Sequence, residues 1–426
     1  MTIRWEEVKD EAIRYFQEYL RIDTTNPPGN EGPAADFLTR ILEGEGLSVE
    51  SFAADPGRPN IVCRLKGDGS KGAIAFLHHM DVVPVEREKW SVDPFGGEIA
   101  DGCIWGRGSV DMKGLGIMQL MVFLLYRRLG LPLKRDLIFL AVSDEETGGS
   151  MGAVWLAANH ADKVQAEFLL NEGGAGAKTA DRSGFNFGIG EKGPLWLRLH
   201  TEGPPGHGSV PLADNAVVRL NAALTRITAY NPPLKIVDEI RGFLEKAGID
   251  RDIDEETLAD NPLIAVPGIG AMFHNTISLT GLQAGQKVNV IPSTAEATLD
   301  CRLLPGEDQA EFLKTLEEII NDPKVRIEVI EGFPASSSSA DTEFYQVMEQ
   351  VLNDNYPGVP VLPSISAGFT DSRCFRVHGT QCYGMQPLLV DRSILATAHG
   401  HDERLPIDEF EKGIRIIFEV IERLNH

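Results

Sequence analysis

The sequence is poor in cysteine and in basic residues, and both shortages narrow what the protein can be. It has only five cysteines among 426 residues, an odd number without CxxC spacing, which argues against a disulfide framework and against a zinc finger. Lysine and arginine number 40 against 63 acidic residues, so the formal net charge is −23. That charge would repel both nucleic acids and anionic membrane surfaces, so neither is an expected partner.

The sequence also lacks a long apolar run. The most apolar helix that we expect, near residues 115–126, is too short to cross a bilayer and is followed by Arg127 and Arg128. Residues 1–21 are charged throughout, with apolar residues at helical spacing, and do not resemble a secretory signal. We therefore expect a soluble cytoplasmic protein, and the length of the chain predicts about two domains.

The first part of the chain alternates predicted strands and helices. Short, fully apolar runs at 73–78, 136–143 and 166–171 are typical of strands buried on both faces of a sheet. A helix is expected over 112–129, between the first two runs. This alternation predicts an α/β fold with a mainly parallel sheet, to which the chain returns after residue 333 and which ends on a helix at 406–424.

From about residue 193 the pattern changes to alternating, half-exposed strands. The order strand, helix, strand, strand, helix, strand over 195–332 predicts an α+β domain of the split βαβ type, interrupted by a helical insertion at about 234–260. We therefore expect a domain at 193–332 inserted into a catalytic domain of 1–192 and 333–426. The Pro-Ala-Ser run at 334–339 would link the second domain back to the first.

Imidazole and carboxylate side chains recur where such a sheet would place a site. His79 follows the first strand in HMDVVP, with Asp81 two residues on. Glu145 and Glu146 follow the second strand in SDEETGG, and Glu172 follows the third in NEGG. Asp111 precedes a helix in GRGSVDMKG, and His399 opens HGHDER. Ligands of open α/β sheets bind beyond the carboxyl ends of the strands, so these side chains should meet.

Imidazole and carboxylate are ligands that suit zinc, and the series predicts a binuclear zinc site that hydrolyses amide bonds. Asp111 could bridge two ions, with His79 and Glu172 completing one and Glu146 and His399 the other. Glu145 points away from Glu146, because adjacent side chains diverge, and is free to act as general base. Asp81 would hydrogen-bond the far nitrogen of His79 and fix its tautomer.

Two further features have structural interpretations. The segment GIGEKG at 188–193 matches the GxGxxG pattern, but a strand follows it where a dinucleotide site needs a helix. His78, beside the ligand histidine on a buried strand, is expected to be a hydrogen-bonded neighbour of the site and not a third imidazole ligand.

The motifs HMDVVP, GRGSVDMKG, DEETGG, NEGG, PGHGS, VNVIP, TDSR and HGHDE together resemble the zinc aminoacylase and carboxypeptidase family. That family includes acetylornithine deacetylase, succinyl-diaminopimelate desuccinylase, aminoacylase and the bacterial glutamate carboxypeptidase. The resemblance runs from residue 21 to the final helix. It implies the same ligands, His79, Asp111 as the bridge, Glu146, Glu172 and His399, with Glu145 as base and Asp81 behind His79. The family's H-x-x-D-E spacing selects His399 and not His401.

The resemblance also implies a lid, often a dimerisation domain, in residues 193–332. On it His207 of PGHGS would polarise the scissile carbonyl, in its own subunit or across a homodimer. Asn289 and Arg302 would contact substrate, and Arg373 with Gly368 would form part of a pocket for a substrate carboxylate, which a guanidinium can bind through two parallel hydrogen bonds. Structural ion pairs are the alternative roles for the two arginines.

We therefore expect a hydrolase, with two zinc ions per subunit, that cleaves an amide bond next to a free carboxylate in N-acyl amino acids. Cobalt or manganese could replace zinc, because the same oxygen and nitrogen ligands suit them. A carboxypeptidase or dipeptidase acting on small peptides is the alternative within this class. A non-catalytic binding protein of the same fold is the alternative outside it, and the intact Glu145 and full ligand set argue against that.

Overall fold

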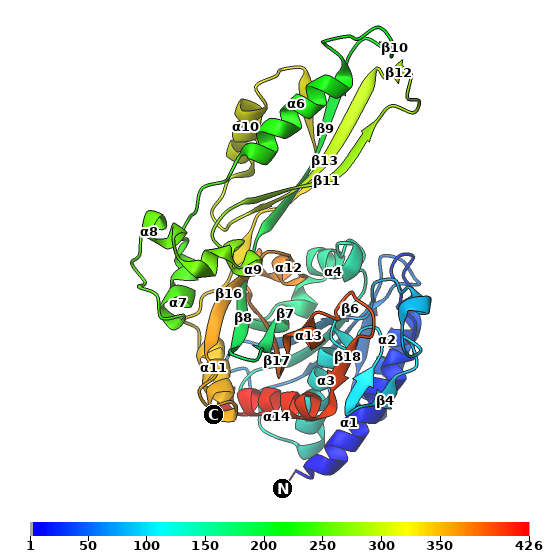
Figure 1. Cartoon of the computed structure of the whole chain (residues 1–426). Coiled ribbons are helices and arrows are strands. Elements are labelled where there is room, and N and C mark those ends of the chain that lie inside the picture. The colour runs from blue at the N-terminus through cyan, green and yellow to red at the C-terminus, as the bar shows by residue number, and fades with distance from the viewer. Residues whose placement is uncertain (1–2, 426) are drawn as a thin grey trace. The chain divides into compact units, whose positions relative to one another are not determined.

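The computed structural model describes residues 3–425, which form two compact units (Figure 1). Unit 1 runs to Ile189 and resumes over Ser338–Ser364 and from Thr370 onward, and unit 2 comprises Gly190–Ser337 and Ile365–Phe369. Residues 1, 2 and 426, which the predicted catalytic domain includes, lie outside the described residues. The division of function between a catalytic domain and a lid stays a prediction.

The main sheet of unit 1 has a parallel centre. Strand β3 pairs in parallel with β6 and β7, and β17 pairs in parallel with β7. The strand order is β1-β2-β6-β3-β7-β17-β8, with β16 beside β8, which confirms the predicted α/β class with a mainly parallel sheet. The strands are β1 (Val49–Phe52), β2 (Asn60–Leu65), β3 (Ile74–His79), β6 (Leu137–Val142), β7 (Phe168–Lys178), β8 (Ser183–Glu191), β16 (Val361–Ser366) and β17 (Gln381–Asp391).

The central strands bury both of their faces, as their unbroken apolar runs predict. Every residue of β3 and β6 is buried. Because successive side chains of a strand point to opposite faces, Ile74 and Phe76 join one core and Ala75 and Leu77 join another. By the same alternation, His78 and His79 point to opposite faces of the sheet.

Helices cover both faces. The larger core contains buried residues of the long amphipathic helices, and the smaller core contains those of three short helices. The helices of the larger core are α1 (Trp5–Leu20), α2 (Gly32–Gly44), α3 (Lys113–Leu129), α11 (Glu343–Asn355) and α14 (Ile407–Leu424); those of the smaller are α4 (Ala153–Asn159), α5 (Ala161–Val164) and α12 (Ser372–Arg376). A one-turn helix, η1 (Arg87–Lys89), lies between β3 and the small sheet described next.

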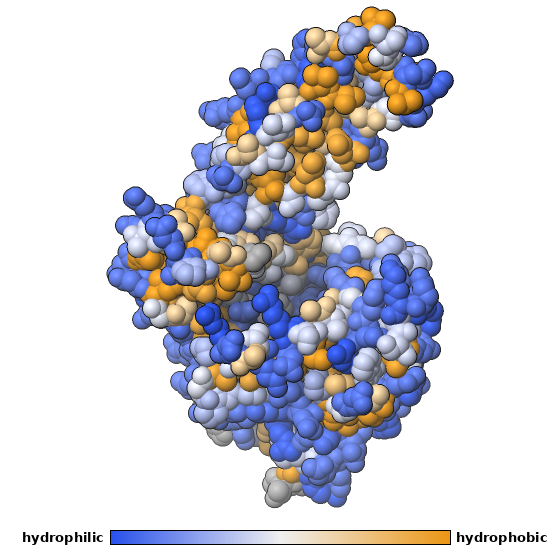
Figure 2. Space-filling model, viewed as in Figure 1, coloured by the Kyte–Doolittle hydropathy of each residue, from blue (hydrophilic) through white to orange (hydrophobic). Residues whose placement is uncertain are grey.

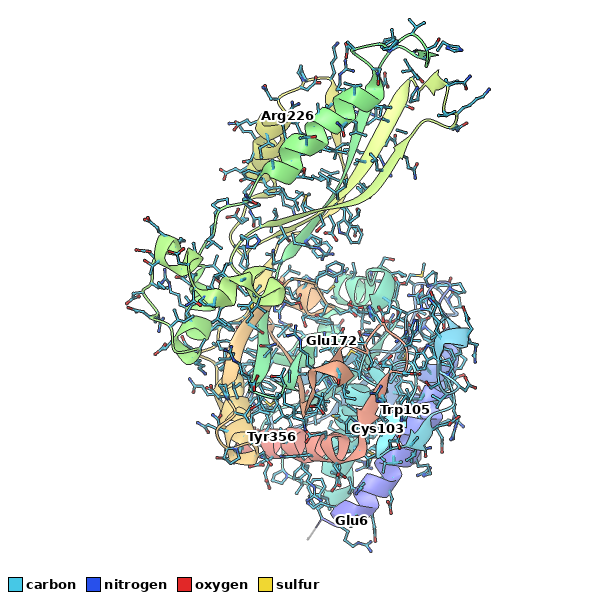
Figure 3. The ribbon with its side chains drawn as sticks, in the orientation of Figure 1. Glu6, Cys103, Trp105, Glu172, Arg226 and Tyr356 are labelled. Atoms are coloured by element: carbon cyan, nitrogen blue, oxygen red, sulfur yellow. The ribbon has the colours of Figure 1, made fainter. Side chains whose placement is uncertain are left out.

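A small sheet completes unit 1. Its order is β18-β5-β4, and it joins the segment before α3 to the segment before α14. Strand β5 (Cys103–Trp105), whose two end residues are labelled in Figure 3, pairs with β4 (Glu98–Ala100) and with β18 (Arg404–Pro406). Among the described residues, no helix is both long and apolar enough to span a bilayer.

Unit 2 is built on a four-stranded antiparallel sheet in the order β11-β13-β9-β14. Two helices share a core with one face of this sheet, where alternate leucines such as Leu195, Leu197 and Leu199 are buried. The chain order confirms the predicted split βαβ pattern: β9 (Gly193–Glu202), α6 (Ala216–Ala229), β11 (Thr276–Ala284), β13 (Thr294–Leu303), α10 (Gln309–Ile320) and β14 (Val325–Gly332).

The remaining elements of unit 2 are short. The helical insertion continues ten residues past its predicted end at residue 260, because proline residues start further short turns there. Its helices are α7 (Asp238–Lys246), α8 (Glu255–Ala259), η3 (Pro262–Ala265) and α9 (Pro267–Gly270). The paired strands β10 (Gly206–His207) and β12 (Val290–Ile291) form a separate ribbon, and β15 (Ser336–Ser337) pairs with the end of β8. The GIGEKG segment joins β8 to β9, so the helix that a dinucleotide site needs is not there.

Candidate metal centre

The predicted ligands follow neighbouring parallel strands. His79 ends β3, and Glu172, labelled in Figure 3, lies in β7. The acids Glu145 and Glu146 form a one-turn helix, η2 (Glu145–Thr147), directly after β6. Because β6, β3 and β7 are adjacent and parallel, their carboxyl ends meet at one edge of the sheet. The sequence pattern predicted this placement.

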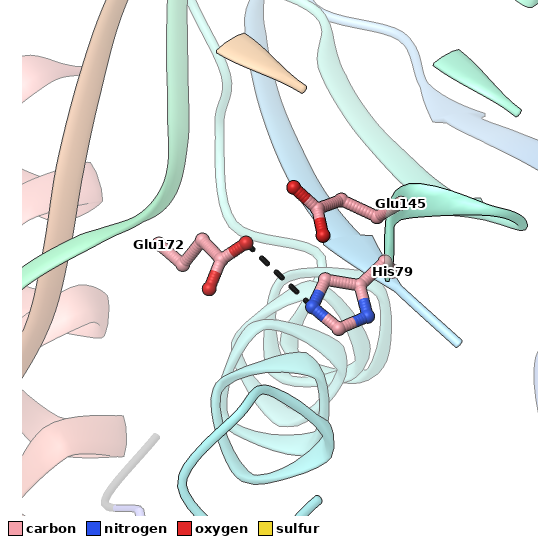
Figure 4. Close-up of side chains that lie close together, drawn as sticks. All are labelled: His79, Glu145 and Glu172. Atoms are coloured by element: carbon pink, nitrogen blue, oxygen red, sulfur yellow. Dashed lines mark ion pairs between the residues drawn. The ribbon is translucent and has the colours of Figure 1, made fainter. Parts of the chain in front are cut away.

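Asp111 lies between two imidazoles. Its Oδ1 is 3.1 Å from Nε2 of His79, and its Oδ2 is 3.0 Å from Nε2 of His399. Glu172 Oε1 lies 3.6 Å from His79 Nε2, and Glu146 Oε2 lies 3.3 Å from His399 Nε2. A dashed line in Figure 4 marks the pair of Glu172 and His79. The structure therefore brings all five predicted ligands together, with one carboxylate between two imidazole–glutamate pairs.

Glu145 and Glu146 diverge as adjacent side chains must. Glu145 joins His79 and Glu172 in a group whose ligand atoms lie within 4.8 Å of one another (Figure 4). Glu146 joins His79 and Asp111 in a second group of the same kind. The two groups share His79, so both acids lie near that imidazole.

The turn that carries these acids is held by Asp144. This residue adopts a left-handed conformation, with φ of 72°, which is uncommon for a residue other than glycine. Its buried carboxylate accepts hydrogen bonds from the Thr147 hydroxyl at 2.5 Å and the Met151 amide at 3.0 Å, and forms an ion pair with Arg58 at 2.8 Å. These contacts over-determine the turn and hold the adjacent acids at the end of β6.

Asp81 contacts His79 differently from the prediction. Nδ1 of His79 hydrogen-bonds the main-chain oxygen of Asp81 at 2.9 Å, while the Asp81 carboxylate lies 3.6 Å away. That carboxylate is occupied by three other donors, namely the Asn26 side chain and the main-chain amides of Glu145 and Glu146, at 2.8, 3.2 and 3.1 Å. The main-chain carbonyl of Asp81 still fixes the tautomer of His79, because a carbonyl oxygen can only accept a hydrogen bond and so requires the proton on Nδ1. Nε2 is left facing Asp111.

The site has an excess of negative charge. Burial, reinforced by neighbouring carboxylates, raises the pKa of Glu145 and of Glu172 well above the ordinary range, against the opposing charge of His79. Burial would also raise the pKa of Asp111, but hydrogen bonds from His399 and His79 outweigh it and lower that pKa. Hydrogen bonds with Asp111 and Glu146 raise the pKa of His399 to about 10. Burial would lower the pKa of His79, but Asp111 and the surrounding acids raise it.

These residues fit a pair of divalent cations. Four half-buried carboxylates that repel one another are held close together, and bound positive charge would offset that repulsion. Oε1 of Glu146 is buried without a hydrogen-bond partner. A buried carboxylate oxygen of this kind is suited to bind a cation. Two imidazoles with carboxylates are the donor set of zinc, cobalt or manganese.

His78 lies on the opposite face of β3 from the metal centre. Its Nε2 lies 3.3 Å from the Tyr19 hydroxyl within the larger core. Burial, together with the positive charges of His79 and Lys113, lowers the pKa of His78 to about 3, so the ring stays neutral. It is a hydrogen-bonded core residue. His401 is also separate, because its Nε2 lies 3.8 Å from Glu86.

Two predicted contact residues share the small ribbon of unit 2. His207 lies in β10 opposite Val290 of β12, and the Gly208 amide donates to the main-chain oxygen of Asn289 at 2.9 Å. The exposed His207 ring has Nδ1 2.7 Å from the Ser209 hydroxyl. The PGHGS and VNVIP motifs are therefore neighbours on one ribbon, although 80 residues separate them in the sequence.

Arg302 lies on β13 among aromatic rings that sequence reasoning missed. Asp300 binds its guanidinium through two hydrogen bonds, at 2.6 and 2.9 Å. The same guanidinium lies 5.9 Å from the Trp196 ring and 5.2 Å from the Phe369 ring. Its Nη1 and the Trp196 Nε1 are both buried without a hydrogen-bond partner. Gly368, next to Phe369, also belongs to unit 2.

Arg373 belongs to unit 1 and braces the turn that follows Glu146. Its Nη1 donates to the main-chain oxygen of Thr370 at 3.0 Å, and its Nη2 to that of Gly148 at 2.6 Å. Neither contact is an ion pair. The contacts show that Arg373 supports the catalytic turn, and a further role toward substrate stays a prediction.

The fold and the clustered ligands define a metal-dependent hydrolase, and the comparisons with known proteins give its family. The chain belongs to peptidase family M20/M25/M40, whose family model matches residues 75–423. It is 30% identical over 392 residues, 85% of this chain and 74% of the other, to a probable carboxypeptidase S-like 2 from Dictyostelium discoideum. It is 29% identical over 432 residues, 100% of this chain and 98% of the other, to aminoacylase-1 of Sus scrofa.

A further relative and a solved structure are also similar to this chain. The human N-fatty-acyl-amino acid synthase/hydrolase PM20D1 is 29% identical over 385 residues, 84% of this chain and 75% of that protein. Among solved structures, the fold resembles an M20 family metallo-carboxypeptidase, Sso-CP2, from Sulfolobus solfataricus, with a TM-score of 0.76 and 21% identity over 97% of this chain and 98% of that one. These likenesses confirm the resemblance read from the motifs and the α/β fold with its inserted domain.

Proposed function

We propose that the protein is a binuclear zinc hydrolase that cleaves the amide bond of N-acyl amino acids, next to their free carboxylate. The observation that carries this proposal is the Asp111 carboxylate between the imidazoles of His79 and His399. Aminoacylase-1 and PM20D1, both named for N-acyl amino acid chemistry, support the substrate class. Asp111 would bridge the ions, His79 and Glu172 would complete one site, and Glu146 and His399 the other.

When bound, two such ions polarise a carbonyl and acidify water. The protein's own contribution is proton transfer and orientation. Glu145 would take a proton from the attacking water at its carboxylate and return it to the nitrogen of the leaving amine. Asp81 holds the base in place through the amide of Glu145 and orients His79 through its carbonyl oxygen.

Further residues are proposed to contact the substrate. Arg302, with the buried and unpaired N–H of its Nη1, would bind the substrate carboxylate. Its flanking rings, Trp196 and Phe369, would shield that pair from water. His207 would polarise the scissile carbonyl, Asn289 would hydrogen-bond the substrate, and Gly368 with Arg373 would complete the carboxylate pocket.

We also propose that unit 2 acts as a lid and mediates a homodimer. Strand β11 is an edge strand whose outer side chains include Leu279 and Leu282, 44% and 60% exposed. Figure 2 shows apolar residues gathered over the strands of this unit. An exposed apolar edge strand favours pairing with a second copy. A cytoplasmic location is supported by the five cysteines, which are all buried free thiols.

A second candidate function is cleavage of small peptides by a carboxypeptidase or dipeptidase. The match to the probable carboxypeptidase S-like 2 favours it, and the fold also resembles the dipeptidase Dug1p from Saccharomyces cerevisiae, with a TM-score of 0.68. Both functions use the same metal centre and a free substrate carboxylate. They differ only in what lies on the acyl side of the amide bond.

Metal content and one pair of substrates test the proposed function. We expect about two zinc ions per chain, and cleavage of an N-acetyl amino acid that stops after chelation and returns with zinc. The same compound with its carboxylate converted to an amide should be cleaved poorly. Equal cleavage of both compounds would contradict the role given to the free carboxylate, and cleavage that persists after metal removal would contradict the metal centre.

A further inference from the structure

Glu403 is a buried carboxylate whose contacts are all with hydrogen-bond donors. Its Oε1 accepts the main-chain amides of Val110 and Asp111, at 2.7 and 3.0 Å. Its Oε2 accepts the amide of Gly108 at 3.0 Å and Nη1 of Arg107 at 2.5 Å. All four donors come from the segment that ends at Asp111, although this segment is almost 300 residues away in the chain. Ionised acceptors make such bonds short and strong.

Arg107 extends the contact to the segment that carries His399. Its Nη2 donates to the main-chain oxygen of Gly400 at 2.7 Å, and Gly400 follows His399 directly. The Gly106 amide also donates to the main-chain oxygen of Glu403 at 2.9 Å. Glu403 and Arg107 therefore tie the segment that carries Asp111 to the segment that carries His399. Both side chains are buried, at 0% and 2% exposed.

We propose that Glu403 is a positioning residue for the metal centre, and that with Arg107 it sets the separation of Asp111 from His399. The inference rests on the proposed metal centre and adds to it a residue that touches neither metal nor substrate. Partners behind metal ligands fix the orientation of the ligands and tune their affinity. Here the partner acts on the main chain of one ligand segment and, through a guanidinium, on the main chain of the other.

Two conservative substitutions test the positioning role of these residues. Glu403→Gln keeps the size of the side chain, but its amide group would face two N–H donors in either orientation. Arg107→Lys keeps the charge but loses the planar fork that reaches Glu403 and Gly400 together. The matched control is Arg135→Lys. Arg135 is equally buried, at 2% exposed, and also contacts acids and a main-chain oxygen, but it precedes β6, at the opposite end of that strand from the metal centre.

The experiment is chelator competition with the full-length protein loaded with zinc, and visible spectra of the same proteins loaded with cobalt. We expect Glu403→Gln and Arg107→Lys to lose metal at chelator concentrations about 10- to 100-fold lower than the parent protein does. Their cobalt spectra should change, while Arg135→Lys behaves like the parent in both measurements. Thermal unfolding of the metal-free proteins measures how much stability Arg107→Lys and Arg135→Lys each lose, so that a general loss of stability can be told from a loss of metal affinity.

The outcomes separate this inference from the proposed function. If the parent binds two ions and both site variants match Arg135→Lys in affinity and spectrum, the positioning role of Glu403 is wrong and the metal centre stands. If the parent binds no metal, the metal centre itself is wrong, and this inference with it. Arg107→Lys decides the test if Glu403→Gln does not fold.

Discussion

The carboxylate of Asp81 accepts a hydrogen bond from the main-chain amide of Glu145 at 3.2 Å. The residue behind His79, a proposed metal ligand, therefore also holds the proposed base. Because the amide, and not the carboxylate, of Glu145 makes this bond, the Glu145 side chain stays available for proton transfer. The first prediction follows from this, because the main chain of Glu145 is held in place while its carboxylate is available to react.

Replacing Glu145 with alanine should leave metal binding intact and remove most of the turnover. General acid–base catalysis contributes about 10²- to 10⁴-fold to a rate, so we expect kcat to fall by that order. Metal content and kcat, measured on the same preparation, check the prediction. The control is Glu88→Ala, an exposed acid of η1. Near-normal turnover in Glu145→Ala would show that another group moves the proton.

Replacing Arg302 with alanine should raise KM for substrates with a free carboxylate. A hydrogen bond to a charged group contributes about 1.5–3 kcal/mol, so KM should rise about 10- to 100-fold, with a smaller effect on kcat. The control is Arg198→Ala, an arginine of β9 that pairs with Glu328 at the surface. If KM is unchanged, the pairing of Arg302 with Asp300 is its whole role, as the structural alternative holds.

The mixing of two inactive variants tests whether His207 acts across a dimer. His207→Ala and Glu145→Ala subunits, each inactive alone, should together recover about a quarter of the parental activity after exchange. Only half of the dimers are then mixed, and each mixed dimer has one complete site. The measurement is activity after co-refolding, with mixed dimers shown to form. No recovery in their presence places His207 in the site of its own subunit.

The contribution of Lys192 to the free energy of unfolding should grow as the pH rises above neutral. This buried side chain donates to the main-chain oxygens of Ala271 and His274 at 3.1 and 2.9 Å. Burial, with the positive charge of Arg302, lowers its pKa to about 7. Since the unfolded chain binds the extra proton at Lys192 over about pH 7 to 10.5, the contribution of this group to the free energy of unfolding should rise with pH there, by at most about 1.4 kcal/mol per pH unit.

The check is denaturant unfolding of the parent and of Lys192→Met between pH 7 and 9.5. The parent should gain stability relative to the variant as the pH rises. Lys314→Met, at an exposed position of α10, is the control and should follow the parent. A difference between parent and Lys192→Met that does not change with pH would mean that Lys192 keeps an ordinary pKa in the folded protein.

Much of the fold could be predicted because its central strands are buried on both faces. The apolar runs at 73–78 and 136–143 correspond closely to β3 and β6. The run at 166–171 is only part of β7, which continues to Lys178. That continuation is rich in glycine and is held by pairing with β8 and β17, so no apolar pattern marks it.

The clustering of the predicted ligands could also be expected from the sequence, because most of them follow an apolar run or precede a helix. Glu172 lies within β7, and His399 lies in the segment before β18. Asp81 was expected beside His79, but the contacts that hold the ligands could not be predicted. The contacts of the Asp81 carboxylate and of Glu403 are mostly with main-chain amides, which carry no sequence signal. The aromatic rings around Arg302 come from two segments that only the folded chain brings together.

The most direct single measurement is hydrolysis of a mixed panel by the zinc-loaded and the chelated protein. The panel holds N-acetyl, N-succinyl and long-chain N-acyl amino acids, acyl-glutamates and dipeptides. We expect metal-dependent cleavage of one class of N-acyl amino acid, with dipeptides cleaved more slowly. Faster cleavage of dipeptides would identify a peptidase, and no cleavage of any compound by protein that holds two ions would contradict the proposed function.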